Sequence, residues 1–503
     1  MPQQSILLDS CLSSLQVAQI GAGAVLVLSD DAQRRIGAAH LLVESIVEHG
    51  VRAYGVNTGV GALCDTVIPR SKQAELSRNI VMSHAVGVGA ALEPAAVRAI
   101  IAAAINNFAH GYSGVRLGVV EGLLALLTHD CVPEVPASGS VGYLTHMAHI
   151  ALVLLGSGAA RSRGRRLSGA EALQSMGLAP LVLEAKEGLS LVNGTPCATG
   201  LSAMALHRTE YLLDWADLIA AMTFENLRGQ IAVFDAAALS LRASAGVAHV
   251  GERLRAVLSG SAILQQSAGR RTQDPLSLRA VPQVHGAVRD LYAQAARVVD
   301  DELRSVTDNP VVVGSAAGPR ALSGAQAVGA ALGLAADSLG IAVAEVAAMS
   351  ERRVDRLVNP LVSNLPAFLA AGDGARSGFM IAQYTAVSLA ADNRRLAAPA
   401  SLDGGVTSGL QEDHLSHATP GALKLLKIID NTEIILAIEL LAAAQAYELQ
   451  PDAAVRAVRT EALYRRVRAE IPHYADDRPL GTDIHAAREM LRQSPPSLDV
   501  LAG

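Results

Sequence analysis

The chain has 503 residues, of which 50% are apolar and only 3% are aromatic. This composition is sufficient for a large core, and its excess of alanine, leucine and valine favours close helix–helix packing over a β-sandwich. The net charge of −6, without a long block of like charges, argues against a nucleic-acid partner.

The cysteines and the apolar runs limit the compartment and the partners further. The four cysteines lie far apart and form no CxxC pair, which indicates reduced thiols in a cytoplasmic protein and argues against a metal site. The first residues lack the basic and then apolar pattern of a secretory signal. No apolar run approaches the roughly 18–20 residues that span a bilayer, so we expect no membrane partner.

Several long segments combine helical periodicity with few helix breakers. These segments are residues 30–49, 92–110, 201–227, 324–357, 377–396 and 421–448. Alternating patterns of the kind that predict strands are few and short. The sequence therefore predicts an all-α fold built on long helices.

Glycine and polar clusters between these segments contain the residues that suggest chemistry. In chain order they read AYGVNTGVG (53–61), RNIVMSH (78–84), VPEVPASGSVGYL (132–144), LVNGT (191–195), QDPLSLR (273–279), SVTDNP (305–310), SGAQAV (323–328) and QEDH (411–414). Each cluster is weak alone, because a glycine-rich turn, a packed tyrosine or a structural histidine explains it equally well. Their number and order together are specific.

This ordered set of motifs resembles that of the histidine and aromatic amino-acid ammonia-lyases over most of the chain. The resemblance implies an all-α, fumarase/aspartase-like fold and a carbon–nitrogen lyase with a small-molecule amino-acid or betaine substrate. It also implies a homotetramer whose active sites are shared between three subunits. One subunit would span residues 1–503, with an N-terminal part (1–200), a central long-helix bundle (201–450) and a C-terminal helical tail (451–503).

The resemblance assigns roles to single residues. Tyr54 would be the base that removes the β-proton, and because a tyrosine pKa lies near 10, its neighbours would have to activate it. His84 would bind the substrate ring, and Asn193 the amino-acid end. Arg279 would clamp the carboxylate with its planar guanidinium. Glu412 would lie near the amino group or the ring.

Further candidates and two departures complete the expected site. Gln273 shares the motif of the clamping arginine, and Gln383 and Tyr384 lie on a helix that would contact the substrate. Leu276 stands where the family has tyrosine, and Ala327 where it has phenylalanine. The second change would free room for a larger group.

The largest departure concerns the cofactor. In the family an Ala-Ser-Gly triplet cyclises into an electrophilic methylidene-imidazolone (MIO), and an alignment without gaps places that triplet on Ser140-Val141-Gly142. Val141 has no hydroxyl to lose as water, and Tyr143 replaces the family's aspartate, so we expect no cofactor. An Ala-Ser-Gly triplet does occur three residues earlier, at Ala137-Ser138-Gly139.

Three hypotheses follow. The first is a lyase without MIO that eliminates an amine from a histidine-like acid or its trimethylammonium betaine, as ergothionase does, because a quaternary nitrogen leaves readily. The second is an MIO-dependent histidine or tyrosine ammonia-lyase whose cofactor forms at Ala137-Ser138-Gly139, although three residues displace the electrophile by several ångströms. The third is a non-catalytic homologue.

Overall fold

The computed structural model describes residues 5–372, 374–450 and 455–502, and it is mostly helical, as predicted. The chain forms two compact units. Unit 1 comprises Met1–His207, Ala295–Asp337 and Pro399–Leu423, and unit 2 comprises Arg208–Gln294, Ser338–Ala398 and Lys424–Gly503. The division expected at residues 200 and 450 stays a prediction. Its ends at residues 1, 451 and 503 lie outside the described residues.

The long helices lie where the periodicity predicts them. They are α2 (Asp30–Glu48), α4 (Pro94–Ala109), α9 (Pro196–Asn226), α15 (Ala330–Val358), α17 (Met380–Leu396) and α18 (Ala418–Glu448). Local signals explain their starts, since the Ser29 side chain accepts a hydrogen bond from Ala32 N at α2 and Pro94 opens α4. Helix α15 begins later than expected because Gly324 N donates to Asn309 Oδ1 at 2.7 Å in the preceding turn.

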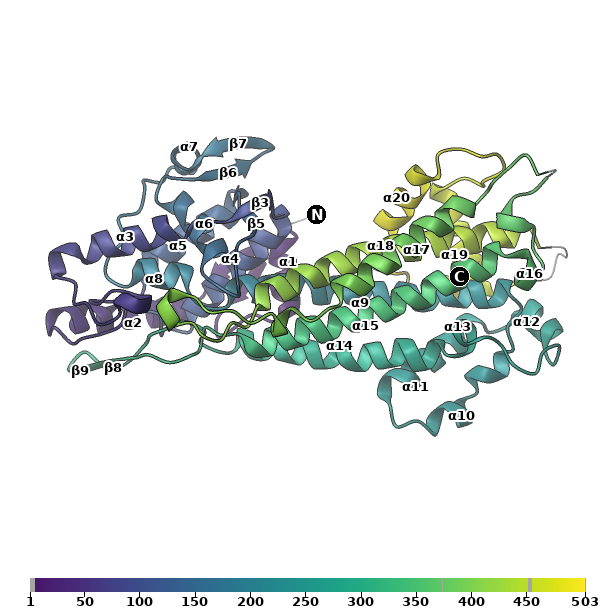
Figure 1. Ribbon diagram of the computed structural model, residues 1–503, viewed down its shortest axis with the longest axis horizontal. Helices are drawn as coiled ribbons and strands as arrows, with labels where there is room; N and C mark the ends of the chain where they lie inside the picture. The colour runs from purple at the N-terminus through teal and green to yellow at the C-terminus, as the bar shows by residue number, and fades with distance from the viewer. Residues whose placement is uncertain (1–4, 373, 451–454, 503) are drawn as a thin grey trace. The chain divides into compact units, whose positions relative to one another are not determined.

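Unit 1 holds all the strands of the described residues (Figure 1). Its other helices are α1 (Ser14–Gly21), α3 (Gln73–His84), α5 (Leu117–Thr128), α6 (Thr145–Leu154), α7 (Gly169–Ser175) and α8 (Glu187–Val192). The parallel pair is β1 (Ser5–Leu8) with β2 (Val25–Leu28). The antiparallel ladders are β3 (Val88–Ala91) with β5 (Pro136–Ser138), β4 (Cys131–Pro133) with β6 (Ala159–Ser162) and β7 (Arg165–Ser168), and β8 (Val311–Ser315) with β9 (Gly318–Leu322).

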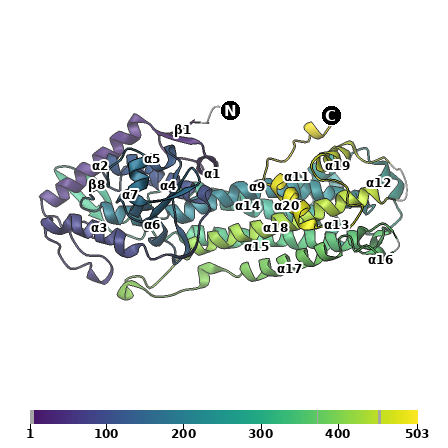
Figure 2. The same ribbon diagram turned by 90° about the horizontal axis from the view of Figure 1, so that it is seen from above.

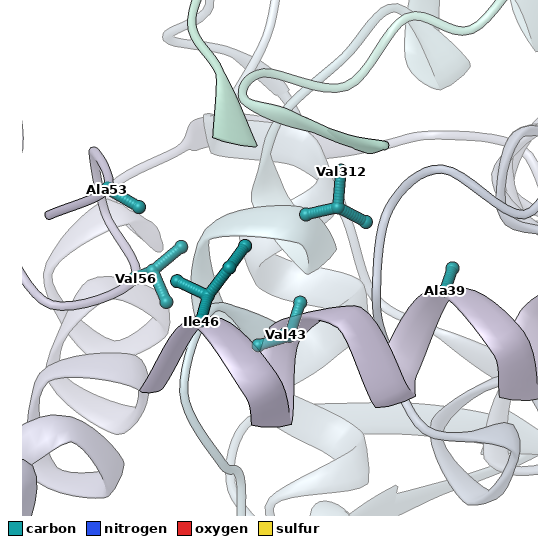
Figure 3. Close-up of a cluster of buried hydrophobic side chains, with 6 residues drawn as sticks. All are labelled: Ala39, Val43, Ile46, Ala53, Val56 and Val312. Carbon is teal, nitrogen blue, oxygen red and sulfur yellow. The ribbon is translucent and has the colours of Figure 1, made fainter. Parts of the chain in front are cut away.

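A small apolar cluster in unit 1 anchors the loop that carries Tyr54. Ala53 and Val56, which flank this tyrosine, are 4% and 0% exposed. Figure 3 shows them beside helix α2 and near Val312 of β8. The remaining members of the cluster are Ala39, Val43 and Ile46. Burial of both neighbours fixes where the chain presents Tyr54.

Unit 2 is built on long helices. The segments of α9, α14 (Val281–Leu303), α15, α17 and α18 that belong to it run side by side in both views (Figures 1 and 2). Its shorter helices are α10 (Ala236–Ser240), α11 (Ala245–Val257), α12 (Ala262–Ser267), α13 (Leu276–Arg279), α16 (Pro360–Ser363), α19 (Val458–Glu470) and α20 (Leu480–Leu491). The predicted central bundle of long helices is thus observed.

Buried charges in unit 2 are paired with each other. Arg353 and Glu439, both fully buried, are joined by two hydrogen bonds of 2.6 and 2.9 Å. Asp217 accepts from His285 Nδ1 at 2.8 Å and from Arg289 at 2.6 Å. Such pairs specify how the helices pack, because a buried charge without a partner is costly.

Among the described residues, one helix is long and apolar enough to span a membrane by length and composition. This is α15, and 61% of its apolar window is buried inside the protein, as in the core helix of a soluble protein. Asp337 and Glu345 lie within this helix, so it contains no uninterrupted apolar run of that length. The cysteines Cys11, Cys64, Cys131 and Cys197 are free thiols. No three His, Cys, Asp or Glu side chains of the described part gather as metal ligands do.

Candidate active site

A cavity of about 950 Å³ in unit 1 brings predicted site residues together from segments far apart in the sequence. Its lining includes Tyr54, His84, Asn193, Ala327 and Glu412. The volume is in the range of small-molecule sites. Within the described residues the lining contains no lysine and no arginine, so its formal charges come from carboxylates.

The Tyr54 loop is held by its own hydrogen bonds. Asn57 Oδ1 accepts from Ala53 N at 2.8 Å, and Thr58 Oγ1 accepts from Gly55 N at 3.2 Å. Gly55 has φ +61, and a Cβ there would lie 2.2 Å from a methyl carbon of Leu189. The loop therefore requires glycine both for its backbone conformation and for its contact with α8.

The Tyr54 hydroxyl accepts a hydrogen bond from Gly61 N at 3.2 Å and faces the cavity. Burial raises the pKa of Tyr54, and the charge of Glu412 raises it further, while the bond from Gly61 opposes the rise. The expected activation of this tyrosine is thus not present in the unliganded site. A positive charge beside the phenol would favour the phenolate, and this chain's own lining provides none.

His84 is the last residue of α3 and lines the same cavity. Its Nδ1 lies 3.1 Å from the Ser83 hydroxyl. Burial lowers the pKa of His84, which keeps the imidazole neutral at pH 7. A neutral imidazole offers one donor and one acceptor, as the predicted role in ring recognition requires.

Asn193 caps the C-terminus of α8, and its side chain is fixed by a hydrogen bond to another segment. Its Nδ2 donates to the Asn309 carbonyl at 2.7 Å. Beneath it the fully buried Lys186 ammonium lies 2.9 Å from Asp308 and 2.7 Å from Ser190 Oγ. This buried pair fixes the turn, so the Asn193 amide lines the cavity in a defined position.

Glu412 lies in a loop before α18, and Tyr143 lies in the turn before α6. The Tyr143 hydroxyl donates a hydrogen bond to Glu412 Oε2. Burial and the Glu412 charge raise the pKa of Tyr143 well above its ordinary value. Sequence analysis identified Tyr143 only as a departure from the family, and its pairing with Glu412 could not be found from sequence.

The Ser140-Val141-Gly142 segment is clamped to the start of α18. The Val141 carbonyl accepts from His417 N at 2.9 Å, and the Gly142 carbonyl accepts from Thr419 Oγ1 at 2.7 Å. Val141 does not line the cavity, whereas Tyr143 and Leu144 do. The two residues that follow the aligned triplet, and not its valine, therefore line the cavity.

The earlier triplet, Ala137-Ser138-Gly139, has the chemistry that MIO formation needs. Ser138 has a hydroxyl to lose, and Gly139, with φ +119, has a nitrogen without a neighbouring side chain. The Ala137 carbonyl oxygen lies 3.1 Å from His146 Nε2, which can polarise it. Residues 136–138 form strand β5, paired to β3 through Ser138 and Val88, so ring closure requires Ser138 to leave that pair.

The other predicted residues belong to unit 2. Gln273, with its amide oxygen turned toward Arg279, accepts from the guanidinium at 2.8 and 3.1 Å. Gln383 donates to Asp355 at 2.8 Å. Leu276 and Tyr384 are 61% and 64% exposed. None of these residues lines the cavity of unit 1.

Some lining residues were missed by sequence reasoning. Cys64 lies in the turn after Gly61, and Asn309 belongs to the SVTDNP motif, to whose residues no role in the site was assigned. Asp413 and His414 extend the Glu412 segment into the cavity wall. Their proximity to Tyr54 or Glu412 along the chain is the signal that could have found all but Asn309.

Three comparisons relate the chain to known proteins. Residues 12–469 match the family model described as aromatic amino acid lyase. The histidine ammonia-lyase of Symbiobacterium thermophilum is 42% identical over 479 residues, which cover 94% of each protein. The solved histidine ammonia-lyase of Trypanosoma cruzi has a TM-score of 0.89 at 35% identity, covering 97% of this chain and 93% of that one.

A further solved structure is the ergothionase of Treponema denticola in complex with desmethyl-ergothioneine sulfonic acid. Its TM-score is 0.90 at 26% identity, covering 97% of this chain and 99% of that one. These matches extend over nearly the whole chain, so they include both units.

The comparisons correct one expectation. We expected no cofactor because Val141 cannot be dehydrated. Relatives that are 40–42% identical are named histidine ammonia-lyase, and that family uses an autocatalytic MIO. The prediction of no cofactor is therefore wrong. It relied on the triplet aligned without gaps and placed second the hypothesis of a cofactor at Ala137-Ser138-Gly139, which carries the required serine.

Proposed function

Because the chain belongs to the aromatic amino acid lyase family and is a carbon–nitrogen lyase, we propose that it eliminates the amine of a histidine-like amino acid to give an acrylate. The observation that supports this proposal most directly is that one cavity is lined by Tyr54, His84, Asn193 and Glu412. A non-catalytic role would not need these groups around a space of substrate size. Histidine is the first candidate substrate, since relatives 42% identical bear that name.

Each lining residue has a part in this elimination. Tyr54 takes the β-proton, the C–H electrons form the Cα–Cβ double bond, and the amine leaves with the electrons of the C–N bond. His84 hydrogen-bonds the ring. Glu412 attracts the ammonium, and the positive charge of that ammonium lowers the pKa of Tyr54 toward the range in which a base works at pH 7.

We propose that the residues that hold the cofactor are Ala137-Ser138-Gly139. When formed, an MIO supplies an electrophile that lowers the barrier to loss of the amine. Support comes from the serine hydroxyl, the unhindered Gly139 nitrogen and the His146 contact to the Ala137 carbonyl at 3.1 Å. Thr145 Oγ1 also donates to the Gly139 carbonyl at 3.2 Å, which orients the third residue of the triplet.

We also propose that a homotetramer completes the site with unit 2 residues of other subunits. Among the described residues that line the cavity, none is a lysine or arginine that could bind a carboxylate, and Arg279 is the predicted clamp. The exposure of Leu276 and Tyr384, 61% and 64%, leaves these side chains available to another subunit. Changing Arg279 to Ala should raise KM about 10–100-fold, because the substrate carboxylate loses a charged hydrogen-bonding partner. An unchanged KM would mean that another cation binds the carboxylate.

A trimethylammonium betaine is the second candidate substrate. The phenols of Tyr54 and Tyr143 and the carboxylate of Glu412 line the cavity together, and aromatic faces with an acid recognise quaternary ammonium groups. The similarity to a solved ergothionase is consistent with this candidate. Turnover of histidine but not of its betaine would exclude it.

The test of the proposed function is a turnover assay with L-histidine. The expected products are ammonia and a urocanate-type acrylate in equal amounts, detected by the ultraviolet absorbance of the conjugated acid. Tyrosine and the betaine of histidine are tested in parallel. Absence of an acrylate from all three substrates would contradict the proposal.

A further inference from the structure

The Tyr143–Glu412 pair includes a position, Tyr143, at which the family pattern has aspartate. Both residues line the cavity together with Tyr54. The Tyr143 hydroxyl donates to Glu412 Oε2 across 269 positions of sequence. This hydrogen bond joins two segments of the cavity wall and fixes the position of the Glu412 carboxylate.

The turn that carries Tyr143 is itself held on several sides. The Tyr143 carbonyl accepts from Ser140 Oγ at 3.0 Å, and the same Oγ accepts from Gly142 N at 3.1 Å. The Gly142 carbonyl accepts from Thr419 Oγ1 at 2.7 Å. The phenol is therefore positioned before a ligand arrives, which reduces the entropy lost on binding.

The chemistry of the pair limits what Tyr143 can do. Burial and the nearby Glu412 charge raise the pKa of Tyr143, so the phenol stays protonated over the range in which enzymes are assayed. It is a donor and cannot serve as a base. Its donor goes to Oε2, while Glu412 Oε1 accepts no hydrogen bond from the described residues. That oxygen remains for a ligand.

The charges around the pair favour a cation. The titratable groups that line the cavity with Glu412 are Tyr54, Cys64, His84, Tyr143, Asp413 and His414. Burial lowers the pKa of His84, so its imidazole carries no charge at pH 7, and the described lining has no lysine or arginine. The formal negative charges of the described lining, those of Glu412 and Asp413, therefore have no lysine or arginine beside them and favour a cation.

We infer that Tyr143 is a positioning residue that holds Glu412 so that Oε1 binds the positively charged nitrogen of the substrate. This inference rests on the proposed function, of which it names the cation-binding part. Loss of the hydroxyl removes the hydrogen bond that holds the Glu412 side chain in place. Affinity for cationic ligands should therefore depend on Tyr143.

The experiment compares Tyr143→Phe with the matched control Tyr112→Phe, whose side chain is 44% exposed and does not line the cavity. Two probes separate the charges of the substrate: histamine carries the ammonium without the carboxylate, and imidazolepropionate carries the carboxylate without the ammonium. Calorimetry should show histamine affinity falling about 10-fold in Tyr143→Phe, as for one lost charge-assisted bond. Imidazolepropionate affinity should stay unchanged, and Tyr112→Phe should match the wild type for both probes.

The split between KM and kcat gives the second readout. In Tyr143→Phe the KM for L-histidine should rise about 10-fold, because Glu412 is no longer held against the ammonium, whereas kcat should change less because Tyr54 is kept. An unchanged KM with unchanged histamine affinity would overturn the inference even if histidine is turned over. A selective loss of histamine affinity in a protein without lyase activity would instead contradict the proposed function and support the inference. Glu412→Gln should reproduce the histamine loss, which guards against misfolding of one variant.

Discussion

Two carboxylates, Glu439 of unit 2 and Glu412 of the cavity in unit 1, differ in how completely they are hydrogen-bonded. In unit 2, Glu439 accepts from Arg353, from Thr223 at 2.7 Å and from Ser350 at 2.6 Å, using both oxygens. In unit 1, Glu412 accepts from Tyr143 through one oxygen only. A carboxylate whose partners are all internal holds a scaffold together, whereas one with an unused oxygen in a cavity can bind a ligand.

The pKa shifts of the two regions point the same way. Although burial alone would raise it, the hydrogen bond from His285 and the charge of Arg289 lower the pKa of Asp217 in unit 2 to about 2. In the cavity, burial raises the pKa of Tyr54 and of Tyr143 and no cation opposes it. The charge of Asp217 is thus stabilised by its partners in unit 2, whereas burial favours the protonated form of the two phenols in the cavity.

The largest effect should come from the cavity. Changing Tyr54 to Phe removes the proposed base and should lower kcat about 10²–10⁴-fold. Substrate binding measured by calorimetry should remain within a small factor of wild type, since the ring is kept. If Tyr54→Phe has the kcat of the wild type, Tyr54 is not the base.

Truncating a fully bonded carboxylate should instead cost stability. Changing Glu439 to Ala leaves the buried Arg353 without its partner and should lower the free energy of unfolding by about 3–5 kcal/mol. The matched control is Asp392→Asn, which breaks the exposed pair with Arg395 and should cost less than about 1 kcal/mol. Urea denaturation measures the free energy of unfolding of both variants. Equal decreases would contradict the stabilising role assigned to Glu439.

The acid sensitivity of unit 2 follows from Asp217. Its folded pKa of about 2 lies below the usual 3.8, so its contribution of about 2 kcal/mol is present above 3.8 and is lost as the pH falls toward 2. The unfolding free energies of wild type and Asp217→Asn should converge over that interval. A constant difference between them would mean that Asp217 has no lowered pKa.

The smallest effect concerns the backbone that presents Tyr54. Gly55 and Gly50 share a left-handed conformation, with φ +61 and +63, but only a Cβ at Gly55 would meet another atom, 2.2 Å away on Leu189. Gly55→Ala should therefore destabilise by at least about 1 kcal/mol more than Gly50→Ala. Thermal unfolding of the two variants measures the difference in stability. Equal midpoint temperatures would contradict the close contact between Gly55 and α8.

The sequence predicts the helices well because their causes are local. Periodicity, the Ser29 cap and Pro94 lie within the elements that they specify. The start of α15 was misplaced because the Gly324–Asn309 bond joins residues on either side of a strand pair. Such contacts follow from the fold, which a local pattern does not contain.

The site was predictable where motif resemblance identified the residues, as for Tyr54, His84, Asn193 and Glu412. What escaped prediction depends on partners distant in sequence. The Tyr143 hydrogen bond to Glu412 and the Lys186 pair behind Asn193 join different segments. The raised pKa of Tyr54 likewise results from burial, and burial is known only once the loop is placed against α8.

We propose that this lyase makes its electrophile from Ala137-Ser138-Gly139 and not from the aligned triplet that contains Val141. The intact mass of the protein, measured beside that of Ser138→Ala, tests this proposal. We expect the wild type to weigh less than its sequence by two water molecules and Ser138→Ala not to show this loss. A wild-type mass equal to that of the sequence would contradict the claim.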